Sequence, residues 1–252
     1  MIYLLYIEKM ITVYWSPWYR DHKVYAENYL AHYEPEKVYV DLVKQKEEKN
    51  IADNYFNCHA FKNFCKNLYS LKNPYTVDLF YEDGRAYSKN PPKTGYDLAI
   101  TSQVKQPSVK NSLTVNYCVN WIFFADKPLN LQTLQPWMHK TESSKTSFYV
   151  PGTFDISRWF RPIEMACQLF PGEITFKSLE GEPLIYANFL TDEPIVLKKF
   201  YLTPELIDMS ISCISLKNFK KFKSLNSLYR VFNRTLLQKK ILKEIQKNVI
   251  EE

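Results

Sequence analysis

The chain has 252 residues, a length near the upper limit of what one hydrophobic core supports, so we expect one large domain or one domain with an appendage. Hydrophobic residues make up 46% and charged residues 24%, a balance that excludes general disorder. The formal net charge is +6. Aromatic residues make up 16% and only five glycines occur, which favours half-buried strands and excludes collagen-like or low-complexity architecture.

Residues 10–90 combine strand-like segments with helix-like ones. Strands are predicted at residues 11–15, 38–43 and 77–81, where apolar and β-branched side chains dominate. A helix is predicted over residues 57–71, because apolar side chains recur there at spacings of three and four. The Asn-Pro-Pro run at residues 90–92 predicts a loop.

An aromatic cluster lies at residues 14–20, which read YWSPWYR. If its rings were exposed, they would suit base stacking or a protein interface. If they were buried, they would be ordinary core residues, and this second interpretation is the one we favour.

Between residues 119 and 202 the pattern changes to short strands and tight turns. Strands are predicted at residues 119–125, 163–169, 184–190 and 195–201, with a short one near residue 176. Pro-Gly, Gly-Glu-Pro and Asp-Glu-Pro turns separate the later ones. We therefore predict an antiparallel β-meander, as in a sandwich or open barrel, and an α+β, β-rich fold.

Helices and positive charge dominate the C-terminal end. Thr203, Pro204 and Glu205 form a helix start, and residues 218–249 predict a long helical region with a break near residues 224–227. Residues 214–252 hold ten Lys and Arg against three Glu, a net charge of +7, which leaves the preceding residues at −1. We therefore divide the chain into a mainly β body, residues 1–213, and a basic helical segment, residues 214–252.

A cationic amphipathic helix can bind nucleic-acid phosphates, an acidic protein or an anionic membrane surface, and it can also be an ordinary solvated face. The candidate anion-binding or nucleic-acid-binding residues are Lys217, Lys220, Lys221, Lys223, Arg230, Arg234, Lys239, Lys240 and Lys243.

Several classes of chemistry lack a signature. The five cysteines are widely spaced without a CxxC pair, which favours reduced thiols and disfavours a structural zinc site. There is no GxSxG, GxxxxGK or GxGxxG motif, so neither a nucleophile elbow nor a known phosphate loop is expected. No apolar run approaches the roughly 20 residues of a membrane helix, and the first residues lack the order of a signal peptide. We expect no catalytic residues, no metal, no cofactor and no membrane partner.

The segment with the most special residues is 150–162, VPGTFDISRWFRP. Its candidate ligand- or partner-binding residues are Asp155, Arg158, Trp159 and Arg161, since the arginines could stack on rings or hold an acidic group. The alternative is a structural corner in which Trp159 fills the core and the arginines pair with nearby carboxylates. The residues alone favour this alternative.

This segment and three others together resemble an uncharacterised protein family of contractile-tailed marine bacteriophages, particularly those that infect cyanobacteria. The other segments are residues 10–18 (MITVYWSPW), 57–69 (NCHAFKNFCKNLY) and 239–242 (KKIL). The resemblance covers nearly the whole chain from Met10, so residues 1–9 would be an upstream extension. It implies a phage origin and expression in the host cytoplasm, and it transfers no catalytic residue.

Our favoured hypothesis is a non-enzymatic phage accessory protein that holds a nucleic acid or a host protein through a basic C-terminal helix, with or without the 155–161 corner. A virion component, such as a head or tail accessory protein, is the first alternative. A small-ligand protein, binding for instance a nucleotide, or an unrecognised enzyme is the second.

Overall fold

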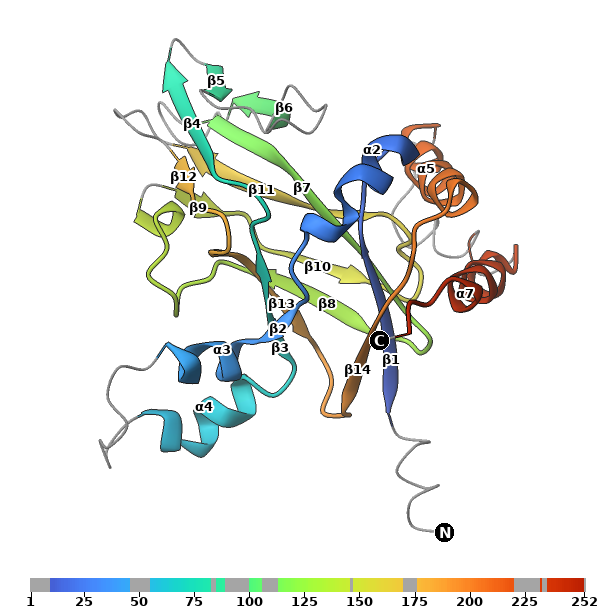
Figure 1. Ribbon diagram of the computed structural model, residues 1–252, viewed down its shortest axis with the longest axis horizontal. Helices are drawn as coiled ribbons and strands as arrows, with labels where there is room; N and C mark the ends of the chain where they lie inside the picture. The colour runs from blue at the N-terminus through green and yellow to red at the C-terminus, as the bar shows by residue number, and fades with distance from the viewer. Residues whose placement is uncertain are drawn as a thin grey trace.

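The structure is a computed structural model that describes residues 10–45, 55–82, 85–88, 100–105, 113–145, 147–169, 176–219, 232, 235–251 (Figure 1). It is a mixed α/β fold made mostly of β-sheet, with several antiparallel sheets. The α+β, β-rich class predicted from composition is therefore confirmed. In the described part of the chain, no helix is both long enough and apolar enough to cross a membrane.

The largest sheet has six strands. They are β1 (Ile11–Pro17), β6 (Ile100–Lys105), β7 (Leu113–Ala125), β9 (Ser147–Tyr149), β11 (Pro162–Leu169) and β14 (Ile195–Lys199). The order is β14-β1-β7-β11-β9, and β6 also pairs with β7. Only the β1–β14 pair is parallel among these pairs.

A second sheet has five strands and is antiparallel throughout. Its order is β10-β8-β13-β3-β2. The strands are β2 (Glu36–Lys37), β3 (Leu68–Lys72), β8 (Asn130–Leu134), β10 (Gly152–Asp155) and β13 (Pro183–Phe189). A small third sheet joins β12 (Phe176–Ser178), β4 (Val77–Glu82) and β5 (Arg85–Ser88).

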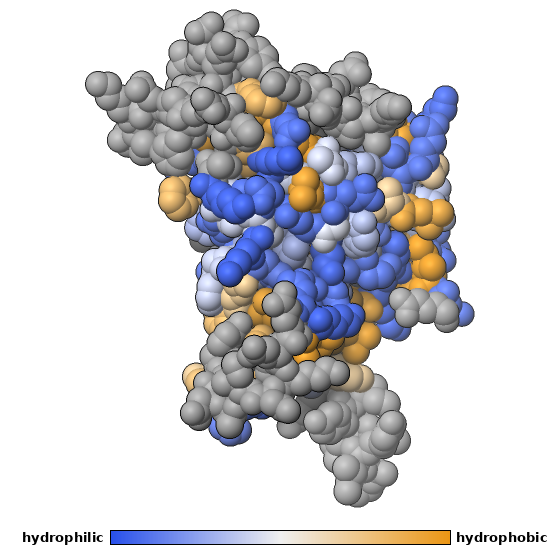
Figure 2. All heavy atoms as spheres, turned by 60° about the vertical axis from the view of Figure 1, so that its left-hand side comes forward, coloured by the Kyte–Doolittle hydropathy of each residue, from blue (hydrophilic) through white to orange (hydrophobic). Residues whose placement is uncertain are grey.

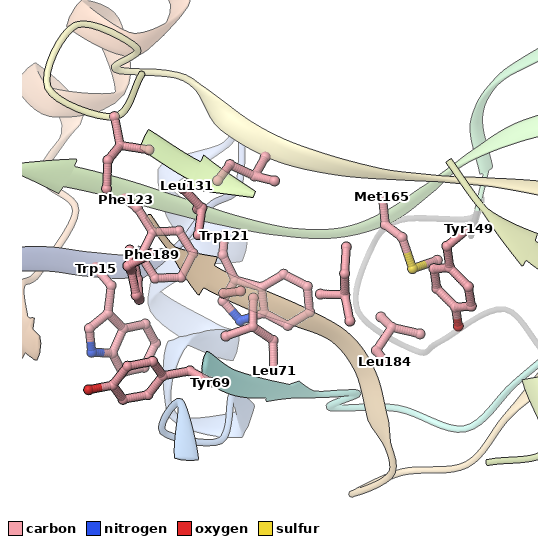
Figure 3. Packing of buried hydrophobic residues seen from close by; sticks show 14 of the residues in the cluster. Trp15, Tyr69, Leu71, Trp121, Phe123, Leu131, Tyr149, Met165, Leu184 and Phe189 are labelled. Atoms are coloured by element: carbon pink, nitrogen blue, oxygen red, sulfur yellow. The ribbon is translucent and has the colours of Figure 1, made fainter. Parts of the chain in front are cut away.

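Side chains from the two large sheets share one hydrophobic cluster, the main core. Trp15 on β1 and Trp121 on β7 lie in it beside Tyr69 and Leu71 of β3 (Figure 3). These rings and aliphatic groups are at most 5% exposed. Because burying one large apolar side chain stabilises a fold by about 1.5–3 kcal/mol, this shared core is the main source of stability.

The six-stranded sheet is buried on both of its faces at the end of β7. On β7, Trp121 and Phe123 face the main core, whereas Ile122 and Phe124 belong to a second cluster, the C-terminal core. This alternation explains why residues 121–125 are continuously apolar: neither face meets water.

The C-terminal core is completed by helices. They are α2 (His22–Asn28), the 3-10 turn η1 (Tyr29–Ala31), α5 (Pro204–Phe219) and α7 (Leu237–Lys247). Asp21 caps α2, because its Oδ1 accepts hydrogen bonds from the backbone N of Lys23 at 2.8 Å and of Val24 at 3.3 Å. Thr203 caps α5 in the same way, with its Oγ1 3.3 Å from the N of Leu206, so the predicted start of this helix is confirmed.

A helical lobe covers part of the five-stranded sheet on its other face. It consists of α3 (Val38–Lys44), the 3-10 turn η2 (Tyr55–Asn57) and α4 (His59–Phe64). The lobe has its own small hydrophobic cluster, which reaches the sheet through Leu68 and Tyr186. One more 3-10 turn, η3 (Ser143–Lys145), precedes β9.

Two local predictions are wrong. Residues 38–43 form the helix α3 and not a strand, because Val38, Asp41 and Leu42 recur at helical spacing and point inward together. The helix predicted over residues 57–71 ends at Phe64, and Leu68–Lys72 is the strand β3. Pairing of β3 with β13 outweighs the local helical pattern.

The predicted β-meander is also wrong, although its individual strands exist. Of the successive strands β11, β12, β13 and β14, the first and last join the six-stranded sheet, β12 the small sheet and β13 the five-stranded one. Nearly every residue of β13 is buried, which suits a central position between β8 and β3. Turn residues mark where strands end but do not specify their partners.

The boundary predicted between residues 213 and 214 falls inside α5. Ile241 and Ile245 of α7 share the C-terminal core with Tyr14 and Phe124 of the six-stranded sheet. The end of the chain is therefore part of the folded body and not an appendage.

Candidate functional site

Helix α7 is fixed to the sheet by its apolar side and by the backbone that follows it. Ile241 and Ile245 are fully buried. After the helix, the N of Tyr201 donates to the O of Asn248 at 2.8 Å, and the N of Ile250 donates to the O of Lys199 at 3.0 Å. These contacts hold the helix in one orientation, so the side opposite Ile241 and Ile245 always faces solvent.

That other side carries lysines. Lys239, Lys240 and Lys243 are exposed, and none of them has a carboxylate within ion-pair distance among the residues that the structure describes. At 100° and 1.5 Å per residue, Lys239 and Lys243 lie on the same stripe, about 6 Å apart along the axis. We call these three residues the basic face of α7.

The last turn of α7 is neutralised. Lys247 Nζ lies 2.6 Å from Glu244 Oε2. The hydrogen bond from Lys247 lowers the pKa of Glu244, and the same contact raises the pKa of Lys247. Glu244 also interacts electrostatically with Lys240, so Lys239 and Lys243 carry most of the available positive charge of this face.

The structure does not describe the side chains of the other predicted basic residues. Lys217 lies on α5, and its side chain is not described. The remaining candidates lie outside the described residues: Lys220, Lys221, Lys223, Arg230 and Arg234.

In the second predicted site, residues 155–161, the carboxylate of Asp155 finds its partners within the segment, whereas the buried Nε1 of Trp159 has no hydrogen-bond partner among the described residues. Asp155 Oδ1 accepts hydrogen bonds from the N of Ser157 at 3.2 Å and from its Oγ at 2.6 Å. Asp155 Oδ2 accepts from Nε of Arg158 at 2.7 Å and also from its Nη2. The carboxylate and the guanidinium thus neutralise each other at the end of β10.

Trp159 and Arg161 form the inner half of the same corner. The Arg161 guanidinium lies 3.2 Å from the centroid of the Trp159 ring, and Arg161 is only 7% exposed. The ring of Trp159 in turn packs against Phe154 at 5.4 Å. The four predicted residues do come together at one corner, where Arg158 pairs with a carboxylate as the structural alternative expects, but Trp159 is half-buried and belongs to none of the three hydrophobic clusters.

A third cluster was not predicted from the sequence. Asp41, His139 and Tyr186 meet between the lobe and the five-stranded sheet, and all three are buried. His139 Nε2 lies 3.4 Å from Asp41 Oδ2, and the other ring nitrogen of His139 hydrogen-bonds to the hydroxyl of Tyr186. Lys72 Nζ lies 3.3 Å from Asp41 Oδ1 and 2.9 Å from Glu36 Oε2.

The electrostatics of this cluster favour charged side chains on Asp41 and Lys72. Burial raises the pKa of Asp41, but the contact with His139 and the charge of Lys72 outweigh it, and the net pKa lies below its usual value. Burial lowers the pKa of Lys72, but Glu36 and Asp41 raise it above the usual value. Burial raises the pKa of Tyr186, so its hydroxyl stays protonated.

No sequence signal marks this cluster. Lys72, His139 and Tyr186 lie 31 to 145 residues after Asp41 in the chain, and only the tertiary fold brings them together. The local sequence offers one hint: Asp41 is a charged residue inside the otherwise apolar and aromatic segment 38–43, VYVDLV. A buried carboxylate needs partners, and that rule could have singled out Asp41 had residues 38–43 been recognised as a helix.

The buried thiols Cys65 and Cys167 are not activated. Burial raises the pKa of Cys65 to about 11 and that of Cys167 to about 12. A thiol is nucleophilic as its thiolate, so these groups are inert near neutral pH. Among the described residues, no three Asp, Glu, His or Cys side chains are arranged to hold a metal ion.

Comparison of the chain with protein-family models, with curated proteins and with solved structures gives no match.

Proposed function

We propose that this protein is a non-enzymatic bacteriophage accessory protein that binds nucleic acid in the host cytoplasm through the basic face of α7. The proposed binding rests on one observation: three exposed lysines lie on a helix whose opposite side is fixed in the C-terminal core. The phage origin and the location rest on the resemblance of residues 10–18, 57–69, 150–162 and 239–242.

Unpaired lysines on a fixed helix suit a phosphate backbone. Each ammonium that meets a phosphate releases a condensed counterion, which favours binding and makes it depend on salt. Because Lys239, Lys240 and Lys243 project from a helix that is already in place, little backbone order has to be gained on binding. Contacts of this type position a nucleic acid but do not read its sequence.

Nucleic acid is preferred to an acidic host protein for one reason. Protein interfaces depend on apolar or aromatic anchors that become buried, whereas the outward stripe of α7 presents lysines and keeps Ile241 and Ile245 inside. Charge alone is enough for phosphates. An acidic protein partner is an outcome that the experiment below can reveal.

The architecture that we propose to support this face is a sandwich-like body with a basic helical C-terminal segment. Two observations support it: the main core draws side chains from both large sheets, and helices cover the outer side of each. A rigid two-sheet body would hold α7 at a constant angle to its ligand.

The test is fluorescence anisotropy of labelled single- and double-stranded oligonucleotides at low salt. One variant carries Lys239→Gln, Lys240→Gln and Lys243→Gln. The matched control carries Lys23→Gln, Lys62→Gln and Lys140→Gln, which are exposed lysines on α2, α4 and a loop, so the net charge falls equally.

We expect the α7 variant to bind about tenfold or more weakly, and the control to bind within about twofold of the parent. Equal losses in both variants would show that total charge and not this face matters. Absence of binding by the parent at low salt would remove the nucleic-acid proposal. Deletion of the C-terminal segment is a poor substitute, because it would remove Ile241 and Ile245 from the core.

A further inference from the structure

The lobe of α3, η2 and α4 is separate from the main core. Its cluster contains Val38, Leu42, Phe56 and Cys65, none of which belongs to the main core. It meets the five-stranded sheet and the turn after β8 through apolar contacts with Leu68, Tyr186, Leu134 and Met138 and through the polar cluster around Asp41. Figure 2 shows the side on which the lobe lies: hydrophilic side chains cover most of it, and hydrophobic ones gather in its lower part.

The polar cluster joins four segments at one point. Asp41 comes from α3, Lys72 from β3 and Tyr186 from β13. His139 comes from the turn after β8. Gln45, at the end of α3, adds a hydrogen bond from its Nε2 to Asp41 Oδ1 at 3.1 Å. Asp41 therefore connects α3 to the turn through His139 and to the sheet through Lys72.

The turn that supplies His139 also presents an exposed tryptophan. Trp137 is 61% exposed, which is unusual for this residue type. Its backbone N donates to the O of Gln135 at 2.8 Å, and the N of His139 donates to the O of Pro136 at 3.1 Å, so the turn is compact. Burial of His139 thus fixes Trp137 at the tip.

The exposed ring of Trp137 meets a ring from the lobe. Phe64, at the end of α4, is 41% exposed, and the two ring centroids are 6.2 Å apart. The pair spans the boundary between lobe and turn. On the turn, Trp137 lies two residues before His139, which contacts Asp41 of the lobe.

We propose that Asp41, His139 and Tyr186 form a latch, that the lobe opens as a unit separately from the sheets when the latch breaks, and that opening separates Phe64 from Trp137. A few buried polar contacts hold an element differently from a large apolar core: they stabilise little beyond their desolvation cost, but they fail together when one partner leaves. Elements held in this way open at lower free energy than the global fold. The inference does not depend on nucleic-acid binding.

The test is hydrogen exchange with mass spectrometry on the full chain. Tyr186→Phe removes one hydroxyl from the latch and keeps the ring. We expect amide exchange to rise about tenfold in residues 38–44, 59–64 and 135–141, and to stay within about twofold in β1, β7 and β11. The matched control is Tyr149→Phe, which removes a buried hydroxyl bonded to Ser143 Oγ at 2.9 Å in the main core.

Two results would overturn the latch: the same rise in every segment, or no rise in the three lobe and turn segments. A second measurement uses the unmodified chain, in case Tyr186→Phe does not fold. In low urea, amides of α3 and α4 should exchange through openings with a much weaker urea dependence than amides of β7. Equal dependence would mean that the lobe opens only with the whole protein.

Iodide quenching reports on the ring pair itself. We expect Tyr186→Phe to increase the quenched fraction of tryptophan emission, and we expect this increase to disappear when Trp137→Phe is added. An increase that persists without Trp137 would contradict the separation of the ring pair.

Discussion

The two helical parts that flank the sheets place their charges in opposite ways. The lobe holds Asp41 at its inner boundary, where Lys72 of β3 and His139 lie within ion-pair distance of its carboxylate. Helix α7 makes its inner contacts with Ile241 and Ile245 and keeps Lys239 and Lys243 outside. A buried, paired charge fixes a structure and cannot serve a ligand, whereas an exposed, unpaired one can.

The comparison predicts the largest stability loss from breaking the charge cluster of the lobe. Asp41→Ala removes one of the two carboxylates that pair with Lys72 and leaves His139 with Tyr186 alone, and removing one member of a buried pair costs up to about 3–5 kcal/mol. Urea denaturation measures the loss. Asp208→Ala on the exposed side of α5 is the control, and we expect it to change stability by less than about 0.5 kcal/mol. Equal small effects would mean that Asp41 is not structurally paired.

On the other side, the anchor of α7 should behave as ordinary apolar core. Ile245→Ala removes a fully buried side chain and should cost about 2–5 kcal/mol. Ile250→Ala, just beyond the helix and partly exposed, should cost clearly less. If both substitutions had the same small effect, α7 would not be fixed in the way described.

A third prediction concerns pH and the aromatic cluster around α2. His32 is buried among Tyr19, Tyr75 and Trp121, and burial lowers its pKa to about 4. The unfolded chain takes up this proton near pH 6.5, so stability should fall as pH decreases from about 6.5 to about 4, by up to about 3 kcal/mol. His32→Gln should remove that part of the pH dependence. If the free energy of unfolding of this variant depended on pH as in the parent, a group other than His32 would take up the proton.

The smallest stability effect is expected on the basic face. Replacing Lys239, Lys240 and Lys243 by Gln should change the free energy of unfolding by less than about 1 kcal/mol, because exposed side chains without partners contribute little. Thermal or urea unfolding measures this. A large loss would mean that these lysines have structural contacts, and any binding defect could then not be assigned to the face.

Local patterns in the sequence predicted the elements better than their arrangement. The alternation in residues 163–169 and the Thr203–Pro204 helix start correspond to β11 and α5. Burial of Tyr14, Trp15 and Tyr19 confirms the core interpretation of the first aromatic cluster. Each of these depends on neighbours within one segment, where spacing and capping act directly.

Sequence patterns could not predict which strands pair when they are far apart in the chain. Residues 68–72 continue a helical pattern, yet they form β3 because β13 lies beside them, more than 100 residues later in the chain. The polar cluster is similar, since Asp41 and His139 gain a partner only through the fold. Of the candidates for anion binding, Lys239, Lys240 and Lys243 lie exposed on α7, and their role stays a prediction.

The salt dependence of nucleic-acid affinity tests the proposed role of α7 most directly. The logarithm of the affinity of the parent for a DNA duplex should fall linearly with the logarithm of salt concentration, and the slope should become shallower by about 3 when Lys239, Lys240 and Lys243 are all replaced by Gln. The control with Lys23, Lys62 and Lys140 replaced should keep the parent slope. A slope that is the same in all three proteins would contradict phosphate binding by this helix.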